Sequence, residues 1–270
     1  MKSNSFEMHY NYPNRYDEHM IHVPSKVKSP KLDANYPYRD KRLPIRFLMT
    51  VLHITIQTVI FVILKLLTGA KVKNKKVLKQ FADSLSNGAI TVSNHVHMWD
   101  FLCILLAVKP KRLYYPAWAT NLKGPNRHCI RLTGGIPVPN TLAGLRRFSK
   151  TMDEILQEKR WLHFFSEGSM WHYYEGVRPF KPGAFKLAVK HKLPIIPIAI
   201  NYRHAKGLAK LIRRKPLLTV NVGEPIPPIN ENGSSKTNTE MLKITRQAIQ
   251  KLAGFDRIIP QTDTHRVANS

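Results

Sequence analysis

From about residue 84 onward, short apolar runs alternate with stretches in which apolar residues recur every three or four positions. The short runs are rich in β-branched and aromatic residues and predict strands at residues 89–93, 112–116, 161–166, 195–200 and 217–222. The periodic stretches predict helices that begin near Asp100, Thr141, Pro182 and Thr237. Strands that alternate with helices in this way are typical of an α/β domain.

Two prolines, Pro194 and Pro197, stand beside and inside the predicted strand at residues 195–200. Proline lacks the N–H group that a sheet ladder uses. We therefore expect this strand at an edge of the sheet or at an irregular crossing.

An apolar run without any formally charged residue covers residues 47–64. As a helix it would be about 27 Å long, slightly less than a hydrocarbon core of roughly 30 Å. Arg46, Thr50, His53 and Gln57 recur along one helical stripe, so the run is not uniformly apolar. Basic residues flank both of its ends: Lys41, Arg42 and Arg46 before it, and Lys65, Lys71, Lys73, Lys75, Lys76 and Lys79 after it.

A single membrane span usually has its cationic excess on one side only. We therefore favour a helix, or a bent helical pair, that lies in one leaflet while its lysines bind anionic head groups. A single span and a buried core helix are the alternatives. The chain divides accordingly into an irregular N-terminal arm (residues 1–40), a basic–apolar–basic membrane-attachment module (41–80), an α/β domain (81–254) and a tail (255–270).

The charge balance points to a polyanionic partner. The 270 residues include 43 Lys and Arg against 17 Asp and Glu, a formal net charge of +26, which favours nucleic acid, an anionic membrane surface or an acidic carrier protein. The uncharged run between lysines favours the membrane, and we expect no nucleic-acid partner. Cys103 and Cys129 are too few for a disulfide framework. Because the first apolar run begins only at Phe47, no signal peptide is visible, and we expect the cytoplasmic face of the cell membrane.

His95 and Asp100 stand five positions apart, just after the first predicted strand. That strand would leave His95 at the carboxyl edge of the sheet, where open α/β sheets bind their ligands. A turn between the two residues would let Asp100 reach back to the imidazole. A carboxylate on one ring nitrogen leaves the other nitrogen basic, as a general base requires. A histidine and an aspartate also lie this close by chance, so the pair is a candidate dyad that needs further support.

Two further segments supply candidate binding groups. Glu167-Gly168-Ser169 follows a predicted strand and would place a hydrogen-bond acceptor and a close backbone approach at the same edge. Lys181-Pro182-Gly183 opens a predicted helix, whose free N–H groups together with the lysine would bind an anion such as phosphate. An ordinary turn and a capped helix with a solvated lysine are the alternative interpretations.

Taken in order, these segments resemble the glycerolipid acyltransferase (PlsC-like) family over about residues 85–225. Asn94-His95 with Asp100 matches the family's Asn-His-x4-Asp box, and Phe165-Ser166-Glu167-Gly168-Ser169 is similar to its Phe-Pro-Glu-Gly-Thr box. Phe180-Lys181-Pro182-Gly183 and Ile196-Pro197 complete the set. The resemblance implies a mixed, mostly parallel sheet flanked by helices, with a membrane-associated helical module before it.

Two departures from the family concern the acceptor. The family's second box ends in arginine, whereas residues 134–140 begin with the expected glycines and end at Asn140. The third box often continues with arginine, where this chain has Met170. In the family these arginines bind the acceptor's phosphate. The candidates to replace them are Lys181, Arg178, Arg131, Arg146 and Arg147.

The resemblance implies direct acyl transfer to a hydroxyl of a lysoglycerolipid, with 1-acylglycerol-3-phosphate as the favoured acceptor and phosphatidic acid as its product. His95 would be the general base and Asp100 its orienting carboxylate. The co-substrate would be acyl-CoA, acyl-ACP or acyl phosphate, with neither a bound cofactor nor a metal. The partners would be an anionic membrane surface, the lysolipid and an acyl carrier protein. The residues implied to bind substrate are Asn94, Glu167, Gly168, Ser169, Arg178, Lys181 and Gly183.

Other functions compete with this one. An acyltransferase of the same family with a phosphate-free acceptor and a non-catalytic lipid- or anion-binding protein share most of these features. A metal site on His95 and His97, completed by His128, His163 or His172, has the ligand types but no known metal spacing. A serine hydrolase is disfavoured because neither Ser166 nor Ser169 lies in a Gly-x-Ser-x-Gly elbow.

Overall fold

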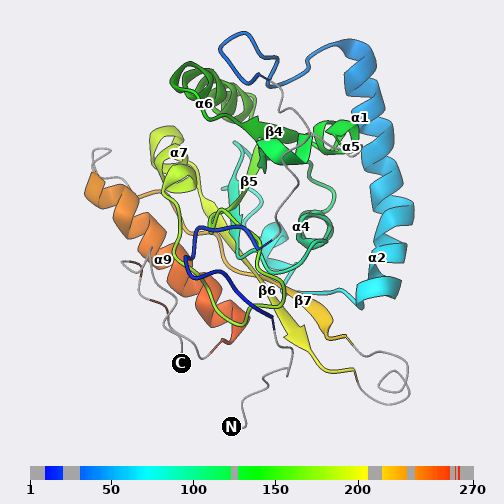
Figure 1. Cartoon of the computed structure of the whole chain (residues 1–270). Coiled ribbons are helices and arrows are strands. Elements are labelled where there is room, and N and C mark those ends of the chain that lie inside the picture. The colour runs from blue at the N-terminus through cyan, green and yellow to red at the C-terminus, as the bar shows by residue number, and fades with distance from the viewer. Residues whose placement is uncertain are drawn as a thin grey trace.

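A seven-stranded sheet organises the chain (Figure 1). The computed structural model describes residues 10–20, 31–122, 127–205, 215–229 and 235–255, together with Ile259 and Gln261. The order across the sheet is β1-β7-β6-β2-β5-β3-β4. Among these strands only β6 and β7 pair antiparallel, so the predicted mixed, mostly parallel sheet is confirmed. The strands are β1 (Lys71–Lys73), β2 (Ile90–Ser93), β3 (Leu113–Trp118), β4 (Gly135–Val138), β5 (Trp161–Phe165), β6 (Ile195–Arg203) and β7 (Leu217–Val222).

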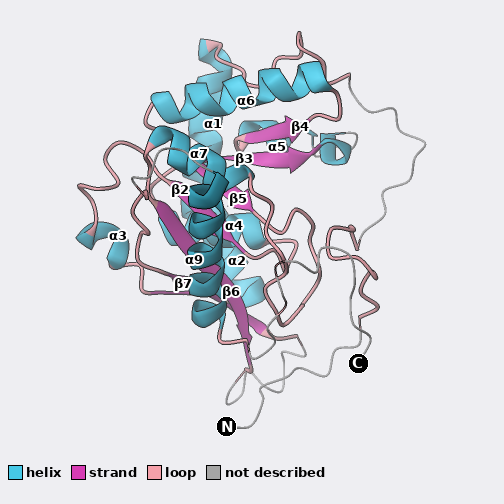
Figure 2. Ribbon diagram, turned by 90° about the vertical axis from the view of Figure 1, so that its left-hand side faces the viewer, coloured by secondary structure: helices cyan, strands magenta, loops and turns pink. Residues whose placement is uncertain are grey.

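Helices cover both faces of this sheet. Figure 2 looks onto α6, α7 and α9, with the sheet behind them. Residues along β6 alternate between two hydrophobic cores: Ile196 and Ile198 pack with α2 and α4, whereas Ile195 and Ala199 pack with α6, α7 and α9. β6 is therefore buried on both faces, which explains its nearly continuous apolar run. The helices are α1 (Leu43–Thr55), a π-helical turn η1 (Ile56–Ile60), α2 (Phe61–Thr68), α3 (Val77–Gln80), α4 (Asp100–Val108), a 3₁₀ turn η2 (Ala119–Leu122), α5 (Arg127–Leu132), α6 (Leu142–Gln157), α7 (Gly183–His191) and α9 (Ser235–Ala253).

Two short edge strands were not predicted. β1 has three residues and β4 has four, too few to display a period of two. β1 pairs with β7, so the sheet begins inside the range that the sequence assigns to the membrane-attachment module. At the other edge, β4 pairs with β3 and contains Pro137, which an edge position tolerates.

The strand with Pro197 lies inside the sheet, so its predicted edge position is wrong. β6 has β7 on one side and β2 on the other. The pairings Ile198↔Val222 and Ile195↔Ile226 leave two residues of β6 opposite three of the neighbouring segment. This extra residue makes a bulge, and Pro197 lies within it. A bulge interrupts the ladder, so the missing N–H of proline is tolerated there, which is the irregular crossing that the sequence offered as its alternative.

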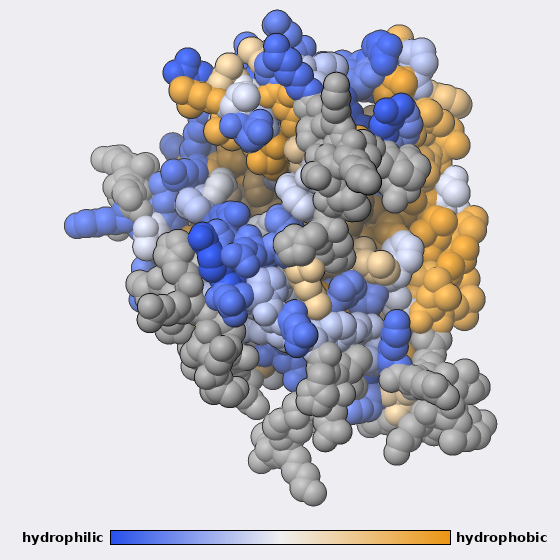
Figure 3. All heavy atoms as spheres, viewed as in Figure 1, coloured by the Kyte–Doolittle hydropathy of each residue, from blue (hydrophilic) through white to orange (hydrophobic). Residues whose placement is uncertain are grey.

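The apolar run forms a helix along one side of the domain. Leu43–Thr68, which comprises α1, η1 and α2, has 26 residues and is long and apolar enough to cross a membrane by length and composition alone. Its inner face packs on the domain through Ile56, Phe61 and Leu64. Figure 3 shows its outer face as the orange right-hand edge. The large exposed apolar residues of that face are Leu43, Phe47, Leu48, Val51, Ile54, Val59, Val62, Ile63, Leu66 and Leu67.

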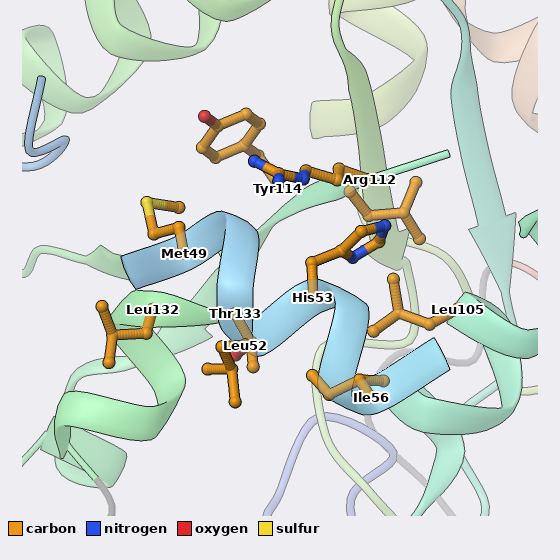
Figure 4. Close-up of a pocket in the computed structure, with 10 residues that line it drawn as sticks. Met49, Leu52, His53, Ile56, Leu105, Arg112, Tyr114, Leu132 and Thr133 are labelled. Atoms are coloured by element: carbon orange, nitrogen blue, oxygen red, sulfur yellow. The ribbon is translucent and has the colours of Figure 1, made fainter. Parts of the chain in front are cut away.

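Part of the polar stripe of this helix faces the domain. His53 Nε2 and Gln57 Nε2 each lie 3.2 Å from the carbonyl oxygen of Pro110, just after α4. Figure 4 shows His53 pointing from the helix toward Arg112. Burial lowers the pKa of His53, which favours a neutral ring beside this arginine. The helix is therefore attached to the domain by polar as well as apolar contacts.

The described parts of the N-terminal arm lie against the domain and contain neither helix nor strand. In the first part, Tyr12 and Tyr16 stack on Trp171, with ring centroids 5.4 Å and 5.7 Å from it. In the second part, the buried Tyr38 donates its hydroxyl to the carbonyl of Leu32 (3.1 Å). Aromatic side chains thus attach an irregular segment to the domain surface.

Gly144 in the first turn of α6 tests how closely this arm packs. A Cβ at Gly144 would lie 2.2 Å from the Leu32 carbonyl oxygen, far inside contact distance. We expect Gly144→Ala to lower the free energy of unfolding by about 1–3 kcal/mol, although alanine alone favours a helix by about 1 kcal/mol. Denaturant titration of both proteins measures the difference.

The control is Gly183→Ala, at the start of α7, where a Cβ would meet nothing within 4 Å. Its stability should stay equal to the wild type or rise slightly. Equal stability of Gly144→Ala and Gly183→Ala would contradict the close packing of the arm.

Candidate active site

The site forms where two parallel strands end. β2 and β5 are neighbours, and Ser93 pairs with Phe165 at their carboxyl ends. The loops that follow leave the sheet at the same edge, so His95 from one loop meets Glu167 from the other. The His95 N–H donates to Glu167 Oε2 (3.0 Å), although the two residues are 72 positions apart in the chain.

The structure brings His95 and Asp100 into direct contact. His95 Nδ1 lies 2.9 Å from Asp100 Oδ2. The carboxylate is fully buried, whereas the imidazole side chain is 24% exposed. Because Nδ1 faces the carboxylate, Nε2 is the nitrogen left for a substrate. The ring also stacks on Phe165, with centroids 3.9 Å and planes 17° apart, so its orientation is fixed from two sides.

Asp100 also shapes the turn that carries His95. Its Oδ2 accepts hydrogen bonds from the backbone N–H groups of Val96 (2.6 Å) and His97 (2.8 Å). Asp100 is the first residue of α4, where the positive end of the helix dipole favours a carboxylate. The arrangement is that of a general base with an orienting carboxylate.

Asn94, a predicted substrate-binding residue, has both polar atoms of its side chain bonded to the backbone of β6. Its Nδ2 donates to the Ile200 carbonyl and its Oδ1 accepts the Ile200 N–H, both at 2.8 Å. The side chain is fully buried and extends the contact between β2 and β6 beyond the last strand residue. Asn94 therefore anchors the end of the strand from which His95 projects.

Three further predicted substrate ligands lie inside the protein: Glu167, Ser169 and Arg178 are buried. Arg178 Nη2 lies 2.7 Å from Glu167 Oε2, and Arg178 Nη1 donates to Ser169 Oγ (2.6 Å). They bond to one another and to the backbone, so their side chains support the site from within. Their contact with substrate stays a prediction.

Gly168, Lys181 and Gly183 lie closer to solvent. Gly168 has φ +79°, and a Cβ there would come 2.6 Å from Lys181 Cε, so the lysine side chain crosses directly over the glycine. The Lys181 N–H donates to the Ser166 carbonyl (2.7 Å), which joins the two loops. Lys181 is exposed, and Gly183 begins α7 with open space beside its Cα. These residues remain candidate anion contacts.

The other candidate arginines lie away from this cluster. Arg131 in α5 donates to the carbonyls of Pro37 (2.6 Å) and Tyr38 (3.3 Å), and so attaches the N-terminal arm. Arg147 in α6 pairs with Glu154 (3.4 Å). Arg146 is exposed on the same helix. Within the described residues, no hydrogen bond or ion pair joins any of the three to His95 or Asp100.

His97 belongs to the turn itself. Its Nδ1 accepts the N–H of Trp99 (3.2 Å), and burial lowers its pKa, so the neutral ring completes the loop. Among the residues that the structure describes, no three His, Cys, Asp or Glu side chains gather as a metal site.

Two rings near the site have places that the sequence analysis did not predict. Phe165, on which His95 stacks, was signalled only by its place at the end of a predicted strand. His163 lies beneath the site in β5 and is fully buried. Its Nδ1 lies 2.9 Å from Thr91 Oγ1, and burial lowers the pKa of His163 to about 3. The ring is therefore neutral in the folded protein.

This buried ring should make the fold sensitive to acid. Below pH 6.5 the unfolded chain protonates His163 while the folded protein does not, so stability is lost as the pH falls toward about 3. We expect His163→Gln to remove up to about 1.4 kcal/mol of this loss per pH unit. Denaturant titrations from pH 7 to pH 4.5 measure both slopes. His128→Gln, at an exposed position in α5, should keep the wild-type slope, and an unchanged slope in His163→Gln would contradict the prediction.

A comparison with protein families agrees with the motifs. Residues 69–201 match the family model described as Acyltransferase. Among solved structures, the chain is similar to the crystal structure of the 1-acyl-sn-glycerophosphate (LPA) acyltransferase PlsC from Thermotoga maritima, with 18% sequence identity, a TM-score of 0.48 and 80% of each chain covered. Among curated proteins, none matches with significance. The matched segment contains His95, Asp100 and Glu167, so the resemblance seen in the motifs is confirmed, and residues 69–201 form an acyltransferase domain.

Proposed function

We propose that this protein is a membrane-associated O-acyltransferase that transfers a fatty acyl group to a hydroxyl of a lysoglycerolipid. The donor is an acyl thioester, as acyl-CoA or acyl-ACP, or an acyl phosphate, and the reaction needs no bound cofactor. The favoured acceptor is 1-acylglycerol-3-phosphate, which yields phosphatidic acid. The observation that carries this proposal is the contact between His95 Nδ1 and Asp100 Oδ2 within an acyltransferase domain.

The geometry suits a direct transfer. His95 Nε2 accepts the proton of the acceptor hydroxyl while its oxygen attacks the acyl carbonyl carbon. A C–O bond forms and the C–S bond of a thioester donor breaks, and the imidazolium returns the proton to the departing thiolate. Asp100 stabilises the imidazolium and keeps the ring in one tautomer, because its buried carboxylate lies 2.9 Å from Nδ1.

Lys181 and the start of α7 are the proposed contacts for the acceptor's phosphate. The lysine is exposed beside Gly168, and Gly183 presents the first turn of the helix without a side chain. Free N–H groups and a nearby ammonium favour an anion there. The absence of arginine at Asn140 and Met170 favours a second candidate, an acyltransferase of this family with a phosphate-free acceptor.

The helix Leu43–Thr68 supports attachment to one leaflet. It meets the domain along its whole length: α1 contacts α5, His53 and Gln57 lie against Pro110, and α2 contacts α4. A helix that crossed the bilayer upright would carry these domain contacts into the hydrocarbon. We infer that the helix lies in the plane of the membrane, with its exposed apolar face in the cytoplasmic leaflet.

Lysines at the end of this helix fit an anionic membrane surface. Burial and the positive charges of Lys109, Lys65 and Lys79 lower the pKa of Lys75. Anionic head groups would offset this repulsion, since basic residues beside a membrane helix attract acidic lipids. An acidic acyl carrier protein offers the same kind of charge as donor.

An acceptor assay tests the reaction. The purified chain on anionic vesicles, supplied with acyl-CoA, is expected to acylate lysophosphatidate faster than lysophosphatidylcholine or monoacylglycerol. His95→Ala should lower kcat by about 10²- to 10⁴-fold, because the general base is lost. The control is His191→Ala, which removes another His–carboxylate contact (2.7 Å to Asp153) outside the site and should keep kcat.

Two results would change the assignment. An unchanged kcat in His95→Ala would overturn the assigned base. Equal rates with phosphorylated and phosphate-free acceptors would favour the second candidate function.

Vesicle binding tests the membrane face. Phe47 and Leu66 are 73% and 66% exposed on the outer face of the helix. The double variant Phe47→Glu, Leu66→Glu should bind anionic vesicles at least about tenfold more weakly, because charge replaces buried apolar area. Lys243→Glu changes the net charge by the same two units on the exposed side of α9, across the molecule (Figure 1), and should bind almost as the wild type does. Equal losses in both variants would show that net charge alone drives binding.

A further inference from the structure

The backbone of His95 is bonded at both of its peptide groups. Its N–H donates to Glu167 Oε2 (3.0 Å). Its carbonyl accepts the N–H of Trp171 (3.1 Å) and an N–H of Arg178 Nη2 (3.4 Å). The residue that carries the catalytic imidazole is therefore fixed by groups from a loop that lies far away in the chain.

Glu167 and Arg178 form the centre of this attachment. Arg178 Nη2 lies 2.7 Å from Glu167 Oε2, and the Arg178 N–H donates to Oε1 (2.9 Å). Both side chains have no exposed area. An ion pair without water is geometrically demanding, because each charge needs its partner in place. One oxygen of Glu167 thus connects the guanidinium to the His95 N–H.

The N-terminal arm closes the other side of the guanidinium. Arg178 Nη1 donates to the carbonyl of Tyr16 (3.0 Å), and the guanidinium carbon lies 4.5 Å from the centre of the Trp171 ring. Trp171 Nε1 in turn donates to the carbonyl of Glu18 (2.9 Å). Residues 16–18 of the arm therefore supply backbone carbonyls that accept hydrogen bonds from Arg178 and Trp171.

We propose that Arg178 is a positioning residue for His95, acting through Glu167, and that residues 16–18 of the arm are a working part of the active-site frame. This inference rests on the proposed function, in which His95 is the general base. A direct bond to a substrate phosphate does not fit Arg178, because its side chain is enclosed and both of its terminal nitrogens are bonded to protein. A displacement of about 1 Å at a reacting group lowers a rate by roughly 10²-fold, so a support at the His95 backbone bears directly on catalysis.

The test compares Arg178→Met and Arg178→Lys with a matched arginine elsewhere. Arg178→Met should lower kcat by about 10²-fold while KM for donor and acceptor stays within about threefold, because Arg178 positions the base and does not touch substrate. Arg178→Lys should have a kcat between those of Arg178→Met and the wild type, because lysine keeps the positive charge. Arg39→Met loses a two-bond pair with Glu158 (2.7 Å each) in another region, and should lose stability while keeping kcat.

A second pair of variants covers the case in which Arg178→Met fails to fold. Trp171→Phe removes the bond to the Glu18 carbonyl and leaves a smaller ring beside the Arg178 guanidinium and the arm, and should lower kcat by about three- to tenfold with KM unchanged. Glu167→Gln keeps the shape of the side chain and removes its charge. The loss of kcat in the double variant Glu167→Gln, Arg178→Lys should differ clearly from the product of the two single losses, because the two residues act as a pair. Unchanged kcat in Trp171→Phe and Glu167→Gln, or a rise in KM for phosphorylated acceptors alone in Arg178→Lys, would overturn the proposal.

A spectroscopic readout separates this inference from the proposed function. In ¹⁵N-histidine-labelled protein, the Nδ1–H signal of His95, assigned by its loss in His95→Ala, should shift or broaden in Arg178→Lys and stay in place in Arg39→Met. If the wild type transfers no acyl group but the signal moves as expected, the proposed function fails and the positioning role stands. If acyl transfer depends on His95 but neither the Nδ1–H signal nor kcat changes in the Arg178 variants, the positioning role is wrong and the proposed function stands.

Discussion

The buried carboxylate of Asp100 is the interaction on which the site depends. One of its oxygens collects three donors, the N–H groups of Val96 and His97 and the His95 ring. A carboxylate out of water is tolerated only where donors surround it, so the turn and the carboxylate stabilise each other. Because Asp100 begins α4, whose Ile104 and Leu105 fill the core against the sheet, burying that helix also places His95, the proposed general base.

Two kinds of long-range contact extend this local unit. Parallel pairing of β2 and β5 places Glu167 beside the His95 backbone. The arm then crosses the same region and supplies carbonyls to Arg178 and Trp171. Because these bonds lie away from water, the site is rigid on its inner side, while Lys181 and Gly183 remain accessible on its outer side. This separation fits the proposed function, in which the base stays in place while substrates enter and leave.

The helix Leu43–Thr68 has an exposed apolar face and a polar face that contacts the domain. Its outer face is unfavourable in water, whereas His53 and Gln57 on its inner side bond to the domain. The helix is therefore firmly attached to the acyltransferase domain, and the proposed membrane attachment would bring lipid next to that domain. In the proposed attachment, the basic residues around its end would add an attraction for acidic head groups that depends on ionic strength.

Local patterns were enough to predict much of this protein. The five predicted strands are visible because short apolar runs rich in β-branched and aromatic residues are typical of buried strands. β1 and β4 lack such a run, and they form only because neighbouring strands offer them partners. The His95–Asp100 pair was also predictable, since five positions and one turn separate them. The edge position expected for Pro197 failed because a bulge depends on the segment opposite, which no local pattern reveals.

The sequence by itself determined the α/β class, the apolar helix with its polar stripe, and the candidate dyad, because each follows from residues within a few turns of one another. Only the tertiary structure decided which polar residues of the motifs are exposed to solvent and which face the interior. Asn94, Glu167 and Arg178 have polar side chains of the kinds that bind substrates. In the folded chain they bond instead to Ile200, His95 and Tyr16, which lie 106, 72 and 162 positions away in the sequence. Burial and hydrogen bonding over such distances are properties of the packed chain, because they exist only after the strands and the arm have come together.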